Sequence, residues 1–177
     1  MTNYSNTLPQ RDAGFENETN DCTVKALMVA AGVPYRDAHT FMAAQGRQAR
    51  KGTYMSVQLL TWAREKKVIF GYRVTQVDAY RRADYRTGGW IKPTLAATMS
   101  KLNSGRFIVI KSRHAIGVVD GVIHDHPSIA GTRARVIAAY KFEASSIVEA
   151  REAKAAAELA AGYARYAACK AVNNGGF

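Results

Sequence analysis

Apolar residues recur with a helical period through much of the N-terminal half of the chain. Between Asn20 and Gly32 they fall at i, i+3, i+4 and i+7, on one face of a helix that Gly32 would end: Val24, Leu27, Met28 and Ala31. Similar patterns predict helices from Pro34 to about Gln45, over residues 56–67 and over residues 94–104. We therefore expect four helices before the main run of strands.

Strand-like runs lie farther along the chain. Residues 68–77, 105–127 and 133–142 are rich in β-branched and aromatic side chains. Asp120-Gly121 lies between two apolar runs, which is a strong signal for a two-residue hairpin turn. That turn predicts four cross-strand pairs: Val119 with Val122, Val118 with Ile123, Gly117 with His124, and Ile116 with Asp125. Helices first and sheet second indicate an α+β fold.

The hairpin register also predicts which side chains meet, because cross-strand partners share a face and alternate residues along a strand share a face. His114, Ile116 and Asp125 should lie together on one face. His124 and His126 should point to the other face. The register therefore brings a carboxylate within reach of the His114 imidazole.

The last part of the chain has a different composition. Residues 143–177 are rich in alanine and contain no proline, which favours helix by propensity alone. Large apolar side chains are sparse on this helix: Ile147, Leu159, Tyr163 and Tyr166. We expect one domain over residues 1–142 and a long C-terminal helix over 143–177 that packs along the body or contacts a partner. The sequence does not indicate an oligomeric state.

Charge and cysteine content narrow the class of protein. The net charge of +11 lies entirely in residues 1–142, which hold 21 Lys and Arg against 10 Asp and Glu. This excess favours contact with nucleic acid or acidic protein, or serves as a solvated basic surface. Two distant cysteines, and no signal peptide or membrane-length apolar run, predict a cytoplasmic protein without disulfides that starts near Met1.

Cys22 lies in the first turn of the first predicted helix. With Asn20 as N-cap, Cys22 is the second helical residue, where the helix N-terminus favours a thiolate. Three carboxylates before it act in the opposite sense: Glu16, Glu18 and Asp21. A thiolate therefore needs a nearby imidazolium, and His114 with its acidic neighbour is the residue for that role. The alternative is a small buried cysteine and a solvated histidine.

The motif "NDCTVKAL", followed later by "GRFIVIKSRHAIGVVDGVIHDHP", resembles the papain-like cysteine peptidase superfamily. The likeness is to its compact bacteriocin-processing branch and to similar small phage-encoded proteins, and it covers roughly residues 10–142. It implies a papain-like fold, in which an N-terminal helical lobe packs on an antiparallel sheet. Cys22 would be the nucleophile, His114 the general base and then acid, and Asp125 the residue that orients the imidazole.

The resemblance also implies hydrolysis of peptide or isopeptide bonds in a peptide or protein substrate, without a cofactor, in the host cytoplasm for a phage-encoded chain. Papain-like enzymes usually carry an oxyanion-stabilising glutamine six positions before the cysteine. Here that position is Glu16, which donates no hydrogen bond when ionised. Asn17 or Asn20 could supply the amide instead, together with the Cys22 N–H. A catalytically degenerate, papain-like interaction protein that engages a host factor is the alternative.

Two further chemistries compete with hydrolysis. His124, Asp125 and His126 are close in sequence and are ligand types that zinc accepts, but no third and fourth ligand is evident on one face. We therefore expect no metal. Basic residues beside aromatic ones could bind a nucleic acid or an acidic partner by neutralising phosphates and stacking bases. The residues concerned are Arg47, Arg50, Lys51, Arg81, Arg82 and Arg86.

Overall fold

A computed structural model describes residues 3–5, 8–77, 82–83, 90–126, 128 and 133–174. The chain divides into two compact units, Met1–Glu143 and Ala144–Phe177.

Four helices of the first unit match the helical patterns in the sequence: α1 (Cys22–Ala31), α2 (Tyr35–Ala44), α3 (Met55–Arg64) and α4 (Leu95–Met99). Gly32 ends α1 in the left-handed conformation, with φ +67°, and its N–H donates to the Met28 carbonyl. The stop signal read from the sequence is therefore confirmed. The fourth helix is much shorter than its pattern suggested.

A seven-stranded sheet forms the centre of the first unit, in the order β1-β8-β7-β6-β9-β3-β2. Its strands are β1 (Asn3–Tyr4), β2 (Val68–Ile69), β3 (Tyr72–Val77), β6 (Arg106–Lys111), β7 (His114–Val119), β8 (Val122–His124) and β9 (Val136–Ala144). A separate small sheet pairs β4 (Arg82–Ala83) with β5 (Trp90–Ile91). The sheet is mixed rather than antiparallel, because β1 joins β8 in parallel. The α+β class holds.

The Asp120-Gly121 turn is confirmed, with φ of +48° and +77° at its two residues. Three of the four predicted pairs form, from Val119 with Val122 to Gly117 with His124. The fourth does not, because β8 ends at His124 and Asp125 lies in the bend that follows.

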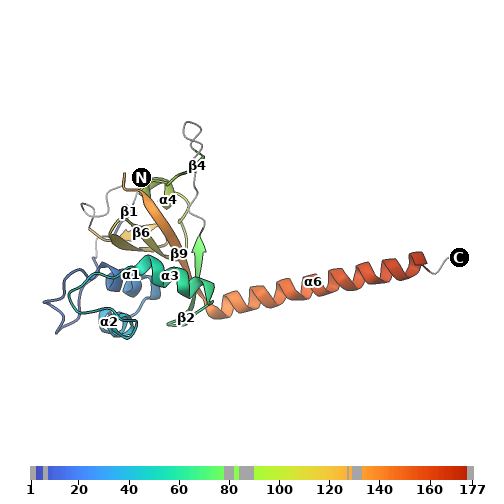
Figure 1. The fold of residues 1–177 in the computed structure, drawn as a ribbon, viewed down its shortest axis with the longest axis horizontal. Helices are drawn as coiled ribbons and strands as arrows, with labels where there is room; N and C mark the ends of the chain where they lie inside the picture. The colour runs from blue at the N-terminus through green and yellow to red at the C-terminus, as the bar shows by residue number, and fades with distance from the viewer. Residues whose placement is uncertain are drawn as a thin grey trace. The chain divides into compact units, whose positions relative to one another are not determined.

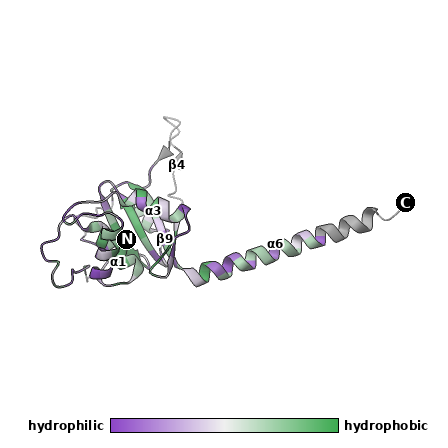
Figure 2. Ribbon diagram, turned by 60° about the horizontal axis from the view of Figure 1, so that its bottom comes forward, coloured by the Kyte–Doolittle hydropathy of each residue, from purple (hydrophilic) through white to green (hydrophobic). Residues whose placement is uncertain are grey.

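Two apolar clusters lie on opposite faces of the sheet. Side chains from α1, α2 and α3 pack with one set of strand residues, which includes Ile108 and Ala115. Leu95 and Met99 of α4 pack with the alternate set, which includes Ile116 and Val118. Figure 1 shows the first three helices gathered on one side of the sheet, and Figure 2 shows the hydrophobic residues concentrated in α1 and β9. The central strands are buried on both faces, and α1 is held directly over β7.

The second unit is the helix α6 (Ser145–Asn174). Three of its large apolar side chains are exposed, Ile147 by 58%, Leu159 by 62% and Tyr163 by 68%, whereas Val148 is buried. The side chain of Tyr166 lies outside the described residues. Among the described residues, no helix combines the length and the apolar character needed to cross a membrane.

Candidate active site

Cys22 is the first residue of α1 rather than the second. The residue before the helix is Asp21, whose side chain makes no capping hydrogen bond, and Asn20 has φ +52°. The expected N-cap is therefore displaced by one residue. Cys22 still lies in the first turn, where backbone N–H groups have no intrahelical acceptor and carry partial positive charge.

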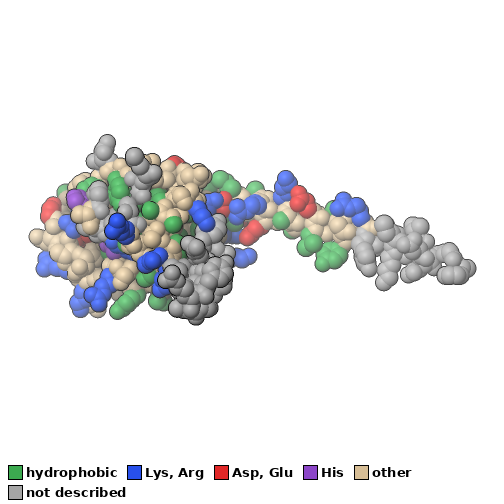
Figure 3. Space-filling model, turned by 90° about the horizontal axis from the view of Figure 1, so that it is seen from above, with side chains coloured by type: hydrophobic (Ala, Val, Ile, Leu, Met, Phe, Trp, Pro, Cys, Tyr) green, Lys and Arg blue, Asp and Glu red, His purple; other side chains and the backbone are tan. Residues whose placement is uncertain are grey.

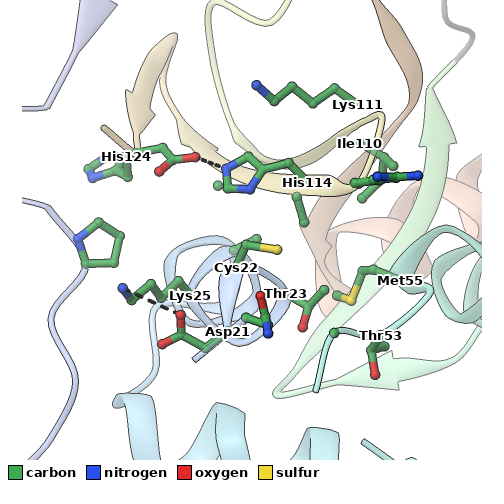
Figure 4. Close-up of a pocket in the computed structure, with 18 of the residues that line it drawn as sticks. Asp21, Cys22, Thr23, Lys25, Thr53, Met55, Ile110, Lys111, His114 and His124 are labelled. Carbon is green, nitrogen blue, oxygen red and sulfur yellow. Dashed lines mark hydrogen bonds and ion pairs between the residues drawn. The ribbon is translucent and has the colours of Figure 1, made fainter. Parts of the chain in front are cut away.

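His114 and Asp125 meet as the hairpin register suggested. His114 is the first residue of β7, and its Nε2 is hydrogen-bonded to Oδ2 of Asp125 (Figure 4). The other carboxylate oxygen accepts the N–H of His126 at 2.8 Å, which fixes the orientation of the carboxylate. Because Nε2 is occupied, Nδ1 is the ring nitrogen left to face the Cys22 thiol.

Two predictions about which side chains share a face of the sheet are wrong. Ile116, expected beside His114 and Asp125, packs in the cluster on the far side of the sheet from α1. His114, the first residue of β7, nevertheless forms a hydrogen bond with Cys22 of α1. His124 and His126, expected to point away, line the same cavity as Cys22.

The protonation states favour a thiolate and an imidazolium. Burial alone would raise the pKa of Cys22, but the hydrogen bond and charge of His114 and the Ala115 N–H outweigh burial, so the pKa is lowered. Burial lowers the pKa of His114, yet hydrogen bonds and charges from Asp125 and Cys22 raise it to about 9. Both shifts favour the thiolate–imidazolium pair over the neutral thiol and imidazole.

Asp21, next to Cys22, interacts with two cations and one hydroxyl. Arg11 Nε lies 2.7 Å from Oδ2, the Tyr35 hydroxyl donates to the same oxygen at 3.0 Å, and Lys25 Nζ lies 3.7 Å from Oδ1. Burial raises the pKa of Asp21, but these partners lower it on balance. The sequence predicted that the Asp21 carboxylate disfavours a thiolate at Cys22. In the structure, the positive charges of Arg11 and Lys25 offset that carboxylate.

Glu18 ties the segment before Cys22 to the loop after α2. Its Oε2 accepts Arg47 Nη2 at 2.8 Å and the Arg50 N–H at 3.1 Å. The Arg50 carbonyl in turn accepts the Thr19 hydroxyl at 3.3 Å and the Asn20 amide at 3.1 Å. These four contacts join two segments about thirty positions apart and hold the chain that leads into α1.

This arrangement overturns one expected partner contact. The Arg47 side chain is completely buried against Glu18, so it is no surface cation for nucleic acid. Arg50 and Lys51 are exposed. Arg81 and Arg86 lie outside the described residues, and of Arg82 only the backbone is described, in β4. On the face shown in Figure 3, Lys and Arg side chains form several separate groups.

The two side-chain amides expected to stabilise an oxyanion, those of Asn20 and Asn17, lie in different places. Asn20 lines the cavity with Cys22, although its amide nitrogen is engaged by the Arg50 carbonyl. Asn17 lines a different cavity, of about 490 Å³, and Glu16 is exposed and accepts the Gly14 N–H. Gln10, which the sequence did not single out, lines the Cys22 cavity. Gln10 therefore adds a second side-chain amide to the lining of this cavity.

The cavity around Cys22 has a volume of about 940 Å³ and two kinds of wall. An apolar part comes from the start of α3 and from β6 and β9: Met55, Ile110 and Ile137. A basic part comes from α1, the end of β6 and the β6–β7 turn: Lys25, Lys111 and Arg113. Figure 4 shows Cys22 among residues of both kinds. In the described part of the chain, no group of three or more His, Cys, Asp or Glu is placed to hold a metal ion.

The site thus combines a thiol of lowered pKa, an imidazole and a carboxylate beside a cavity, a combination suited to acyl transfer. Comparisons of this chain with protein-family models, with curated proteins and with solved structures find no match.

Proposed function

We propose that this chain is a papain-like cysteine hydrolase that cleaves peptide or isopeptide bonds through Cys22, His114 and Asp125. The observation that carries the proposal is the continuous hydrogen-bonded series from thiol to imidazole to carboxylate at the wall of a large cavity. A buried structural cysteine needs neither an imidazole partner nor a lowered pKa.

In the acylation step, the Cys22 thiolate attacks the scissile carbonyl carbon and forms the C–S bond. The developing oxyanion accepts hydrogen bonds from the Cys22 N–H and the Gln10 amide. His114, protonated at Nδ1, gives that proton to the leaving amine as the C–N bond breaks. The product is a thioester on Cys22 and a free amine.

In the deacylation step, water attacks the thioester carbonyl. The neutral His114 imidazole accepts a proton from that water, and the C–S bond breaks to release a carboxylic acid and restore the thiolate–imidazolium pair. Asp125 remains ionised, holds the ring by Nε2 and stabilises the imidazolium. The cycle consumes one water and needs no cofactor.

The test is the rate at which iodoacetamide alkylates Cys22 between pH 4 and 10, with Cys169→Ser in every protein. Fast labelling well below the free-thiol pKa of about 8.5, lost in His114→Ala and kept in the control His126→Ala, supports the proposal. His126 is a suitable control because it lines the same cavity and contacts Asp125 through its backbone. Slow labelling that ignores His114 would refute the enzyme and favour a degenerate, papain-like interaction protein.

A further inference from the structure

Two pairs of neighbouring residues meet at the wall of the Cys22 cavity. Gln10 is followed by Arg11 in the segment before α1, and Asp21 is followed by Cys22 at the start of α1. Gln10 and Cys22 both line the cavity, whereas Arg11 is outside its described lining. Arg11 Nε lies 2.7 Å from Oδ2 of Asp21. An ion pair therefore joins the residue after Gln10 to the residue before Cys22.

Asp21 gives Arg11 a fixed point of attachment. The Asp21 side chain is 8% exposed, and its Oδ2 also accepts the hydroxyl of Tyr35, a fully buried residue of α2. The Asp21 carbonyl accepts the N–H of Lys25 at 3.0 Å, so the backbone of Asp21 is held by α1. Burial limits the screening of this ion pair by solvent, and the pair restrains its partners more than an exposed pair would.

The Gln10 side chain is free to act on a substrate. It is exposed and makes no hydrogen bond with another described residue, whereas the Asn20 amide donates to the Arg50 carbonyl. A glutamine side chain has several rotatable bonds, so it stabilises an oxyanion effectively only when its backbone is held in place. Adjacent Cα atoms are about 3.8 Å apart, and an anchor on Arg11 therefore restrains the backbone of Gln10 directly.

We propose that Arg11 is a positioning residue of the active site, whose ion pair with Asp21 holds the Gln10 amide beside the carbonyl that Cys22 attacks. This inference rests on the proposed function, in which the Gln10 amide and the Cys22 N–H donate to the oxyanion. Arg11 touches neither the thiol nor the substrate and acts through Gln10. An oxyanion donor acts within about 2.7–3.1 Å of the oxyanion, so a loosened Gln10 would lose most of its effect.

The test compares two reactions of Cys22, of which only one forms an oxyanion. With p-nitrophenyl acetate, the thiolate forms a C–S bond through a tetrahedral oxyanion, and the C–O bond then breaks to release p-nitrophenolate. With iodoacetamide, the same thiolate displaces iodide and no oxyanion forms. The burst of p-nitrophenolate gives the acylation rate, and every protein carries Cys169→Ser. The ratio of acylation rate to alkylation rate cancels the fraction of thiolate, since both reactions require it.

Gln10→Ala should lower this ratio about a hundredfold, as expected for the loss of one oxyanion donor. Arg11→Met should lower it about tenfold or more, because a displaced donor loses most of its effect. The double variant should fall no further than Gln10→Ala alone, since Arg11 acts through Gln10. The control is Lys154→Met, which removes a cation from an exposed ion pair of α6 and should leave the ratio unchanged.

Asp21→Asn breaks the same ion pair from its other end, and it keeps the test decisive where Arg11→Met fails to fold. It should also lower the ratio. The two variants should shift the pH profile of iodoacetamide labelling in opposite directions: Arg11→Met to higher pH, because the Asp21 carboxylate is less opposed, and Asp21→Asn to lower pH, because that carboxylate is gone. A loss of ratio shared by both variants cannot come from the charge at Cys22.

The two proposals fail in different ways. If Gln10→Ala lowers the ratio but Arg11→Met and Asp21→Asn do not, the positioning role is overturned and the hydrolase stands. A double variant in which the two losses multiply would also overturn it, because Arg11 would then act independently of Gln10. A ratio that Gln10→Ala leaves unchanged would leave Arg11 no donor to position and overturn it as well. Iodoacetamide labelling that is slow and independent of His114 would refute the hydrolase itself.

Discussion

The contact between α1 and β7 gives the sharpest prediction, because these two elements carry Cys22 and His114. A Cβ added at Gly117 would lie 2.6 Å from Cβ of Val29 and 2.7 Å from its Cγ1, as well as 3.3 Å from the Ala26 carbonyl oxygen. Non-bonded carbons need about 3.5–4.0 Å. A change of Val29 rotamer cannot relieve a clash with its own Cβ, so Gly117→Ala must push α1 away by roughly 1 Å.

The displacement of α1 should lower both the stability of the protein and its reaction rate. Overpacking of a well-packed interior costs about 1–3 kcal/mol, so the free energy of unfolding should fall by that amount. A displacement of about 1 Å at a reacting group can cost roughly a hundredfold in rate. We therefore expect Gly117→Ala to fold, to hydrolyse its substrate about a hundredfold more slowly, and to show its Cys22 labelling profile shifted to higher pH.

The measurements are urea denaturation and the pH profile of iodoacetamide labelling, with Gly162→Ala as the matched control. Gly162 lies within α6, and a Cβ there meets nothing within 4 Å. Alanine at that position should be neutral or stabilise the helix by about 0.5–1 kcal/mol. If Gly117→Ala kept both the wild-type stability and the wild-type labelling profile, helix-to-strand packing would not set the thiol–imidazole geometry.

Three further outcomes follow from the structure. Because the pKa of His114 in the folded protein, about 9, lies above its ordinary value of 6.5, its stabilisation is complete below pH 6.5 and is lost as pH rises through about 9; urea titrations should show this step, moved to lower pH in Asp125→Asn. Gln10→Ala should lower kcat by about a hundredfold to a thousandfold yet leave the Cys22 labelling rate unchanged; equal loss of both would assign Gln10 a structural role instead. Arg47→Met removes the buried partner of Glu18 and should lower the free energy of unfolding by about 3 kcal/mol, and Glu18→Gln in the same chain should restore part of that loss; no loss in Arg47→Met alone would show that the Glu18–Arg47 ion pair does not hold the two segments together.

Local signals account for the elements that the sequence predicted well. The apolar spacing before Gly32 and the Asp120-Gly121 dipeptide each specify a backbone conformation within a few residues, and both are confirmed. The β2–β3 hairpin is different. Its two turn residues are Phe70 and Gly71, with φ of +50° and +80°, and phenylalanine is an uncommon residue at positive φ. The sequence therefore indicated one strand where the chain makes two.

Long-range contacts account for what the sequence could not supply. Strand β1 has only two residues and exists through its pairing with Val122 and Ile123, so no periodicity could reveal it. Arg47 belongs to a basic run and looks like a surface residue, yet its partner Glu18 lies 29 positions away. The relevance of Gln10 likewise depends on where an irregular segment passes the cavity. Irregular segments carry no spacing rule from which such contacts can be read.

The charge around Cys22 could not be predicted from its neighbours in the sequence alone. Asp21 directly precedes Cys22, and by Coulomb's law its carboxylate should disfavour a thiolate. Arg11, ten positions earlier, and Lys25, four positions later, both form ion pairs with that carboxylate, and their positive charges offset its effect on the thiol. His114 then supplies the charge that the thiolate lacks. The charge around Cys22 is therefore set by Arg11 and His114, which come from other segments of the chain.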